Sequence, residues 1–134
     1  MGCPFSISEA VKYLLDSNIL INAARPEALY GACRPWVKHP DAAVSAISRV
    51  EVLSFTRLTA ADAVAFAAMF LLLPQLPVTD AVLDRAIIIR QQFRLKTPDA
   101  IVAATALEHG LALITADRGF RPVAGLLVID PLAT

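Results

Sequence analysis

The chain has 134 residues, of which 57% are hydrophobic and 18% are charged. These values exclude an intrinsically disordered chain, because disorder requires low hydrophobicity and a high net charge, and here twelve basic and twelve acidic side chains cancel. The length predicts one domain, which we place at residues 11–134 behind an N-terminal extension at residues 1–10. A net charge of zero argues at first against a nucleic-acid-binding protein, since such domains usually carry a basic patch.

The high apolar content predicts a surface that a partner or a second copy covers, because a small domain cannot bury all of its apolar side chains. A membrane span is excluded: the longest apolar run, at residues 63–73, is shorter than the roughly 20 residues that a spanning helix needs. The N-terminus lacks the features of a secretory signal. Cys3 and Cys33 show no metal-site spacing, so we expect free thiols and a cytoplasmic location.

Strands and helices alternate along the first half of the chain. A first apolar strand ends on Asp16, and Ser17 or Asn18 caps the helix that follows it. A weaker helix then ends before Pro40. The predicted ranges are a strand at 11–15, helices at 19–24 and 27–38, a strand at 42–47 and a helix at 48–57.

The second half continues this alternation. Thr59 and Asp80 cap two helices, and Thr97-Pro98 opens a third, which Gly110 ends. The predicted ranges are helices at 60–73, 80–93 and 97–109, a short segment at 76–78, and strands at 111–115 and 126–129. Short apolar strands between helices predict an α/β fold, a three-layer α/β/α sandwich around a mostly parallel sheet of about five strands.

Four acidic residues follow these strands or open these helices. Asp16 comes directly after the first strand, and Asp117 follows the 111–115 strand with one residue between. Asp99 lies in the first turn of the 97–109 helix, and Glu51 lies near the start of the helix after the second strand. Because ligands bind at the carboxyl ends of the strands in such sheets, we expect the four carboxylates to face one crevice.

Each acid also has an explanation that involves no chemistry. Ser48 and Glu51 have the spacing of a capping box, in which Glu51 would bind the Ser48 amide. Asp99 would complement the helix dipole, and Asp16 and Asp117 would be ordinary loop residues.

Four carboxylates at one edge would repel one another and raise each other's pKa. A divalent cation resolves this conflict, and oxygen ligands without histidine or cysteine favour Mg²⁺ or Mn²⁺ over zinc. We expect His39 and His109 to lie elsewhere on the surface. A carboxylate-bound Mg²⁺ keeps positions open for water and substrate phosphate, which is the arrangement for hydrolysing a phosphodiester.

Four segments resemble the acidic motifs of the PIN domain. They read LLDSNILI (14–21), SRVEVL (48–53), KTPDAIVAATA (96–106) and LITADRGF (113–120), and the third is the most specific. The resemblance extends over residues 12–131, nearly the whole chain, and within the family it is closest to VapC-type toxins of toxin–antitoxin pairs. It implies a Mg²⁺- or Mn²⁺-dependent endoribonuclease that cleaves RNA, forms a homodimer and is inhibited by a cognate antitoxin protein.

The resemblance also implies a role for each motif residue. Asp16, Glu51, Asp99 and Asp117 become the catalytic and metal-binding quartet, with Asp16 and Asp99 as the first metal ligands. Glu51 and Asp117 would bind a second ion or position the attacking water. Ser17, Asn18 and Thr115 would orient the carboxylates. Ser17 stands where threonine is commoner, and Gly119 stands where some relatives carry a further acid, which leaves the choice between one ion and two open.

Two other functions fit parts of the pattern. One is a PIN-like domain that binds RNA or a partner without cleaving RNA. The intact quartet of acids argues against this alternative. The other is a haloacid-dehalogenase-like phosphotransferase, which also begins with an aspartate after its first strand. That family needs a second aspartate two residues later, where this chain has Asn18.

The contacts to RNA and to the antitoxin are predicted from basic and aromatic residues. Arg49 and Arg118 adjoin acidic motifs and are the candidate phosphate contacts. Arg85, Arg90, Arg94 and Lys96 form either an RNA groove or a solvated face, and Tyr30, Trp36 and Phe70 either contact an antitoxin helix or belong to the core. With the quartet set aside, twelve basic and eight acidic side chains remain, a surplus of four positive charges that is compatible with moderate RNA affinity.

Overall fold

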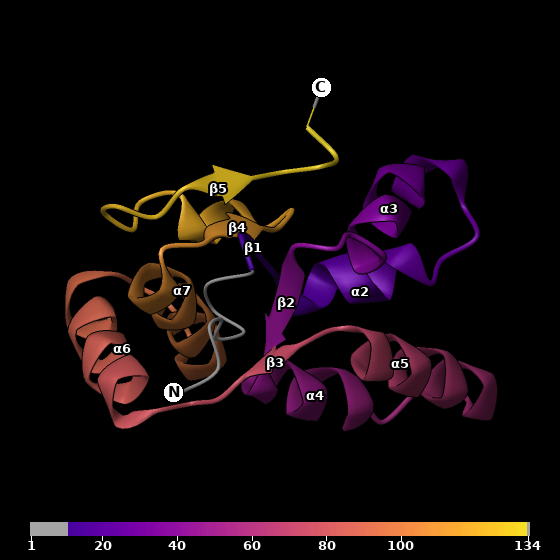
Figure 1. Cartoon of the computed structure of the whole chain (residues 1–134), viewed down its shortest axis with the longest axis horizontal. Helices are drawn as coiled ribbons and strands as arrows, with labels where there is room; N and C mark the ends of the chain where they lie inside the picture. Colours follow the sequence, from indigo (N-terminus) through magenta and orange to yellow (C-terminus); the bar gives the residue numbers. More distant parts are fainter. Residues whose placement is uncertain (1–10, 134) are drawn as a thin grey trace, which may run out of the picture.

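A computed structural model describes residues 11–133 of the chain. Five strands form one sheet in the order β3-β2-β1-β4-β5, and every neighbouring pair is parallel. The strands are β1 (Tyr13–Leu15), β2 (Ala42–Ser45), β3 (Gln75–Leu76), β4 (Ala112–Ile114) and β5 (Val128–Ile129). The sheet runs through the middle of Figure 1, and all five carboxyl ends point to the same edge.

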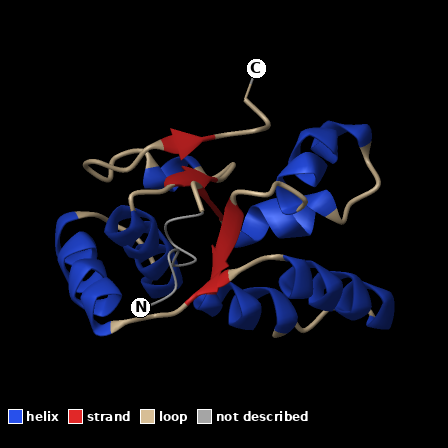
Figure 2. Cartoon of the chain, viewed as in Figure 1, coloured by secondary structure: helices blue, strands red, loops and turns tan. Residues whose placement is uncertain are grey.

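Helices cover both faces of this sheet (Figures 1 and 2). The α6–α7 pair lies on one side, and α2 to α5 lie on the other. The helices are α2 (Ser17–Ala23), α3 (Arg34–Val37), α4 (Ala46–Leu53), α5 (Ala60–Leu72), α6 (Asp80–Gln92) and α7 (Thr97–His109), with 3-10 turns η1 (Ala28–Cys33) and η2 (Arg118–Phe120). The predicted three-layer α/β/α sandwich with a five-stranded parallel sheet is confirmed.

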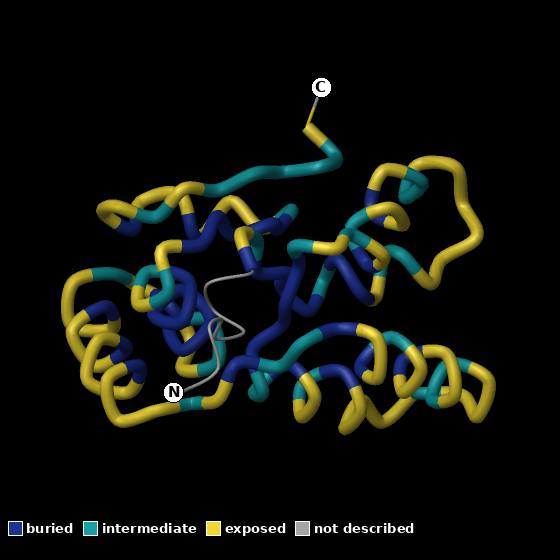
Figure 3. Tube along the Cα trace, viewed as in Figure 1, coloured by how far each residue is buried: buried dark blue, intermediate teal, exposed yellow. Residues whose placement is uncertain are grey.

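The alternation of side chains along each strand divides the core in two. Leu14 and Leu113 point toward α6 and α7 and join the cluster that contains most of α7. Their neighbours Leu15 and Ile114 point the other way and pack with α2, α4 and α5. Figure 3 shows this buried band running along the strands and α7, with exposed residues at the rim. Among the described residues, no helix is long and apolar enough to cross a membrane.

Several helix ends differ from the prediction. The Thr59 cap and the end at Gly110, which has φ of 65°, are confirmed. The long helix is capped by Thr79 rather than Asp80, and α2 is capped by Asp16 rather than Ser17 or Asn18. In both cases the capping side chain lies one or two residues earlier, because the cap must accept an amide from the first turn while its own backbone is still extended.

The helix after β2 also starts earlier than predicted. Ser45 ends the strand and accepts the Ile47 amide as the cap, so α4 begins at Ala46. Ser48 therefore lies inside the helix, and the predicted capping box is wrong. The predicted helix at 27–38 is a 3-10 turn followed by one short α-helical turn, because Pro35 has no amide to continue an earlier helix.

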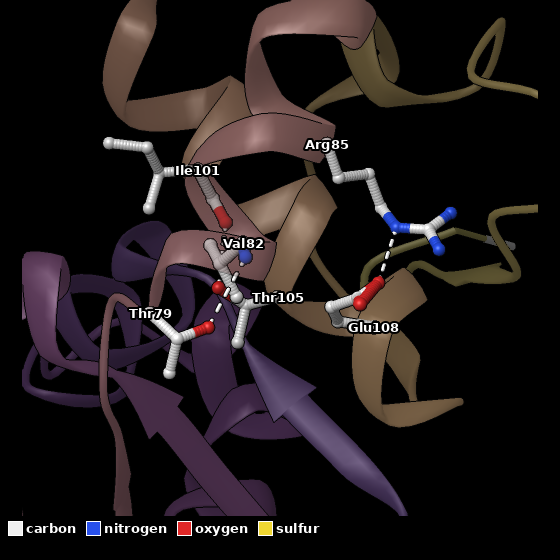
Figure 4. A network of polar contacts seen from close by, with 6 residues as sticks. All are labelled: Thr79, Val82, Arg85, Ile101, Thr105 and Glu108. Carbon is white, nitrogen blue, oxygen red and sulfur yellow. Dashed lines mark hydrogen bonds and ion pairs between the residues drawn. The ribbon is translucent and has the colours of Figure 1, made fainter.

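The α6–α7 hairpin fixes the direction of α7, which carries Asp99 in its first turn. Figure 4 shows its contacts: Arg85 Nε of α6 donates to Glu108 Oε2 of α7 at 2.6 Å. The Thr79 cap accepts the Val82 amide at 3.2 Å, and the buried Thr105 hydroxyl donates to the Ile101 carbonyl inside α7. The Arg85–Glu108 pair thus ties the C-terminal end of α7 to α6, and Asp99 lies at the opposite end of the helix.

Candidate active site

Asp16 lies at the centre of the carboxyl edge, at the end of the middle strand β1. Its side chain is 5% exposed, and three groups donate hydrogen bonds to it. The Ser17 amide donates to Oδ1 at 2.8 Å, while Thr115 Oγ1 and Asn18 Nδ2 donate to Oδ2 at 2.9 and 3.0 Å. Because both oxygens are held, the carboxylate has one orientation.

Thr115 and Asn18 connect the loops that follow β1 and β4. Asn18 Nδ2 also donates to Thr115 Oγ1 at 3.0 Å, and Asn18 Oδ1 accepts the Ala116 amide at 3.3 Å. The Asp117 amide donates to Thr115 Oγ1 at 3.0 Å. This network joins residues almost a hundred positions apart and sets the backbone position of Asp117 relative to Asp16.

Glu51 reaches the same edge from α4. Ser17 Oγ donates to Glu51 Oε1 at 3.0 Å, so the carboxylate is oriented by α2 and not by the Ser48 amide. Ser48 Oγ is buried and has no hydrogen-bond partner within residues 11–133. The structural explanation of Glu51 as a capping residue therefore fails.

Asp99 and Asp117 complete the set. Asp99 is half-buried in the first turn of α7. Asp117 is exposed and caps η2, where its Oδ1 accepts the Gly119 amide at 2.8 Å. A side chain at position 119 would place its Cβ 3.1 Å from that Oδ1, so glycine at this position leaves the Asp117 carboxylate room to accept the amide.

The pKa values show that the acids influence one another. Burial raises the pKa of Asp16 from 3.8 to about 7; hydrogen bonds from Thr115 and Ser17 oppose the rise, and the charges of Asp99 and Glu51 add to it. Burial and the Asp99 charge raise the pKa of Glu51. Burial and the Asp117 charge raise the pKa of Asp99, against the opposing charge of Lys96. The predicted convergence of these carboxyl groups is thus visible in their electrostatics.

The donor set fits a hydrated divalent cation. Within residues 11–133, no three acidic, histidine or cysteine side chains are arranged to hold one ion together. Mg²⁺ in proteins is typically bound by one or two carboxylates together with water and substrate phosphate, and Asp16 and Asp99, whose charges act on each other, would form such a pair. A cation would also offset the repulsion and the burial that raise their pKa values.

The family model of the PIN domain matches residues 13–126. The chain belongs to the PIN-domain family. A toxin–antitoxin complex from Klebsiella pneumoniae contains a similar chain, with 29% identity, a TM-score of 0.74, and coverage of 90% of this chain and 98% of that one. The DNA-bound VapBC of Salmonella typhimurium is similar at 18% identity, a TM-score of 0.74 and the same coverage.

FitAcB from Neisseria gonorrhoeae is similar at 23% identity and a TM-score of 0.71, covering 89% of this chain and 97% of that one. The comparison with curated proteins found no significant match. The predicted resemblance to PIN-domain proteins of toxin–antitoxin systems is confirmed, and the family supports a nuclease in general terms. The haloacid-dehalogenase alternative is dropped, because the PIN model covers most of the chain and Asn18 serves as a donor to Asp16.

The basic residues of this PIN domain differ in how they relate to the acids. Arg118 is exposed directly after Asp117. Arg49 reaches away from Glu51 toward β3, where its Nη1 lies 3.5 Å from Gln75 Oε1. Lys96 carries the positive charge that acts on Asp99, and its place three residues before Asp99 in the sequence is a signal for this interaction.

Three aromatic residues were expected either to contact an antitoxin helix or to belong to the core, and two of them pack in or against the core. Phe70 is buried in the core, and Trp36 packs against the same cluster. The Tyr30 hydroxyl accepts a hydrogen bond from Arg25 at 3.2 Å. His39, expected on the surface, is half-buried and stacks on Trp36 with ring centroids 5.4 Å apart. These residues lie outside the hydrogen-bond network that holds the acids.

Proposed function

We propose that the chain is a cytoplasmic, metal-dependent endoribonuclease that hydrolyses RNA phosphodiester bonds and acts as a toxin neutralised by a cognate antitoxin. The observation that carries the proposal is the buried Asp16 carboxylate, held by three donors and electrostatically coupled to Glu51 and Asp99. A buried, oriented carboxylate of raised pKa among other acids is costly for stability and useful for binding a cation.

Asp16 and Asp99 would hold Mg²⁺ or Mn²⁺, and Glu51 and Asp117 would bind a second ion or position the attacking water. When bound, the ion supplies an activated water and neutralises charge on the phosphate. Glu51 Oε1 is held by Ser17, and its Oε2, without a hydrogen-bond partner among the described residues, accepts the proton of the attacking water. Ser17, Asn18 and Thr115 keep the carboxylates in place, and Arg118 binds the phosphate.

During hydrolysis one bond to phosphorus forms and one breaks. The water oxygen forms a bond to phosphorus while the bond from phosphorus to one sugar oxygen breaks. One proton of the water goes to Glu51, and solvent at the exposed Asp117 side returns a proton to the departing oxygen. Asp16 and Asp99 would thus hold the ion, while Glu51 takes the proton of the water.

Two protein partners belong to the proposal, a cognate antitoxin and a second copy of the chain. The similar chains of known structure include members of toxin–antitoxin complexes. Apolar side chains remain exposed on α5, where Val64, Leu71 and Leu72 are 72%, 88% and 69% exposed. Exposed apolar surface of this kind is typical of a protein interface, and the antitoxin would restrain the nuclease by covering the acidic edge.

The proposal is tested with the protein freed from any antitoxin. We expect cleavage of single-stranded RNA with Mg²⁺ or Mn²⁺, loss of cleavage with chelator, and recovery when metal is restored. Asp16→Asn abolishes cleavage, whereas Lys38→Gln, at the other edge of the sheet, leaves it unchanged. A wild-type protein that binds RNA but does not cleave it with either metal would contradict the nuclease and favour a non-catalytic PIN domain.

A further inference from the structure

A cavity of about 440 Å³ lies between α2, α4 and α5, beside the acidic edge. This volume is within the range of small-ligand sites, which starts near about 300 Å³. Val52 of its wall directly follows Glu51, and Ile21 comes four residues after Ser17. Since four residues of α-helix rise about 6 Å, the cavity begins one helical turn from the hydrogen bond between Ser17 and Glu51.

The wall of this cavity is apolar and aromatic. Phe55 is 59% exposed and Phe66 is 5% exposed, so one ring is available at the mouth and the other closes the base. An exposed phenylalanine beside a cavity offers a flat surface against which another ring can stack. This arrangement suits a planar ligand better than a branched one.

Three charged side chains stand around the cavity. Arg25 is engaged with Tyr30, its guanidinium 5.1 Å from the ring centroid. Arg57 is exposed and has neither a hydrogen-bond nor an ion-pair partner in the part of the chain that the structure describes. Asp62, in the first turn of α5, supplies a carboxylate. A ligand that satisfies all of these groups is planar, negatively charged on one side and carries hydrogen-bond donors.

We propose that this cavity binds one unstacked nucleobase of the RNA substrate, close to the bond that is cut. The inference rests on the proposed ribonuclease function and adds a site of substrate recognition to it. Proteins read single-stranded RNA by stacking splayed bases on aromatic side chains and by bonding their polar edges. Phe55 stacks on the base, Arg57 pairs with an adjacent phosphate, and Asp62 accepts hydrogen bonds from the base.

The carboxylate at position 62 also predicts a preference among bases. A carboxylate accepts hydrogen bonds from an exocyclic amino group, as it does from cytosine. Uracil offers only its ring N3–H as a donor, so we expect the amino-bearing bases cytosine, adenine and guanine to be favoured over uracil in the cavity. An apolar side chain from a protein partner would fill the aromatic wall but leave Arg57 and Asp62 without partners, which is why the charges favour RNA.

The test compares Phe55→Ala and Arg57→Gln with matched controls at the opposite edge of the sheet, the exposed Leu127→Ala and Lys38→Gln. Steady-state cleavage of a short single-stranded RNA should show KM raised about tenfold in the first pair, with kcat changed far less and melting temperature unchanged. The controls keep the wild-type KM. Sequencing of the cleaved ends should show uracil under-represented near the cut in wild type, and Asp62→Asn should relax this preference.

The outcomes separate this inference from the proposed function. If wild type cleaves RNA but Phe55→Ala and Arg57→Gln retain its KM and its cleavage pattern, the cavity proposal is overturned. If these variants instead weaken only the binding of the antitoxin, the cavity is a protein-docking site and the proposal is equally overturned. If wild type fails to cleave, the nuclease proposal fails, and anisotropy of labelled RNA decides whether Phe55→Ala still weakens binding.

Discussion

An aspartate lies at each edge of the sheet, but the two aspartates have different surroundings. At the carboxyl edge, Asp16 is buried among other acids. At the amino edge, Asp41 lies 4.0 Å from Lys12 Nζ, and its amide donates to His39 Nδ1 at 3.0 Å. The same two strands, β1 and β2, supply both edges. Asp41 at the amino edge has a cationic neighbour, whereas Asp16 at the carboxyl edge has no ion-pair partner among the described residues.

The two edges also differ in how their side chains affect the stability of the fold. At the amino edge Tyr13, Trp36 and His39 form a cluster with ring centroids 5.0 to 5.4 Å apart. Such contacts stabilise the fold without any bound partner. The carboxyl edge instead buries a carboxyl group, Asp16, whose charged form is destabilised by that burial. Substitutions at the carboxyl edge should therefore lower RNA cleavage, whereas substitutions at the amino edge should lower stability and leave cleavage unchanged.

The largest effect is expected from neutralising an acid at the carboxyl edge. Asp99→Asn should lower RNA cleavage by about 1,000-fold, which corresponds to about 4 kcal/mol of transition-state stabilisation. Asp41→Asn, the matched change at the amino edge, should leave the cleavage rate within about twofold. Initial rates at saturating Mg²⁺ measure both. Equal losses in the two variants would remove the distinction between the edges.

The second prediction concerns pH and stability. Without metal, folded Asp16 keeps its proton up to about pH 7, whereas in the unfolded chain it loses that proton near 3.8. The folded state therefore binds the proton more tightly, and the free energy of unfolding falls as pH rises through this window, by on the order of 2–4 kcal/mol. Urea titrations between about pH 4 and 8 measure the fall.

Two comparisons sharpen that measurement. Asp16→Asn should flatten the dependence on pH, leaving only the smaller contributions of Glu51 and Asp99, whose pKa values are also raised. Mg²⁺ added near pH 8 should restore stability to the wild type and not to this variant. A wild-type stability that rises between these pH values would contradict the electrostatic description of the edge.

A smaller effect is expected from Thr115→Val, which keeps the shape of the side chain but removes the hydrogen bond to Asp16. Loss of such a supporting contact typically costs about 10–100-fold in activity. Because the Thr115 bond lowers the pKa of Asp16, the pH midpoint of the stability curve should also move upward. Thr115→Ser should retain both properties. A variant with normal activity and an unmoved midpoint would show that Thr115 does not position Asp16.

The smallest effect belongs to the amino edge. Trp36→Leu removes the stacked contact with His39 and should lower the free energy of unfolding by about 1 kcal/mol. Cleavage at saturating Mg²⁺ should stay unchanged, because the ring lies outside the network that holds the acids. Thermal melting and initial rates measure the two quantities. A loss of activity without a loss of stability would reverse the roles assigned to the edges.

Much of the site was predictable because parallel strands bring their carboxyl ends to one edge. Asp16 and Asp117 each follow an apolar strand, and Asp99 follows the Thr97-Pro98 helix start, so their convergence could be inferred from local patterns. The contact between Ser17 and Glu51 could not, because it joins residues 34 positions apart. Glu51 had an equally good local explanation as a capping residue until the early start of α4 removed it.

The sequence by itself determined the α/β class, the alternation of helices and strands and the four acids, since these follow from hydrophobic periodicity and from residues adjacent in the chain. The tertiary structure alone decided which oxygens are held, that Arg49 reaches β3 instead of the acids, and that a cavity opens between α2, α4 and α5. These features depend on the strand order β3-β2-β1-β4-β5. That order brings distant residues together, and no local pattern encodes it.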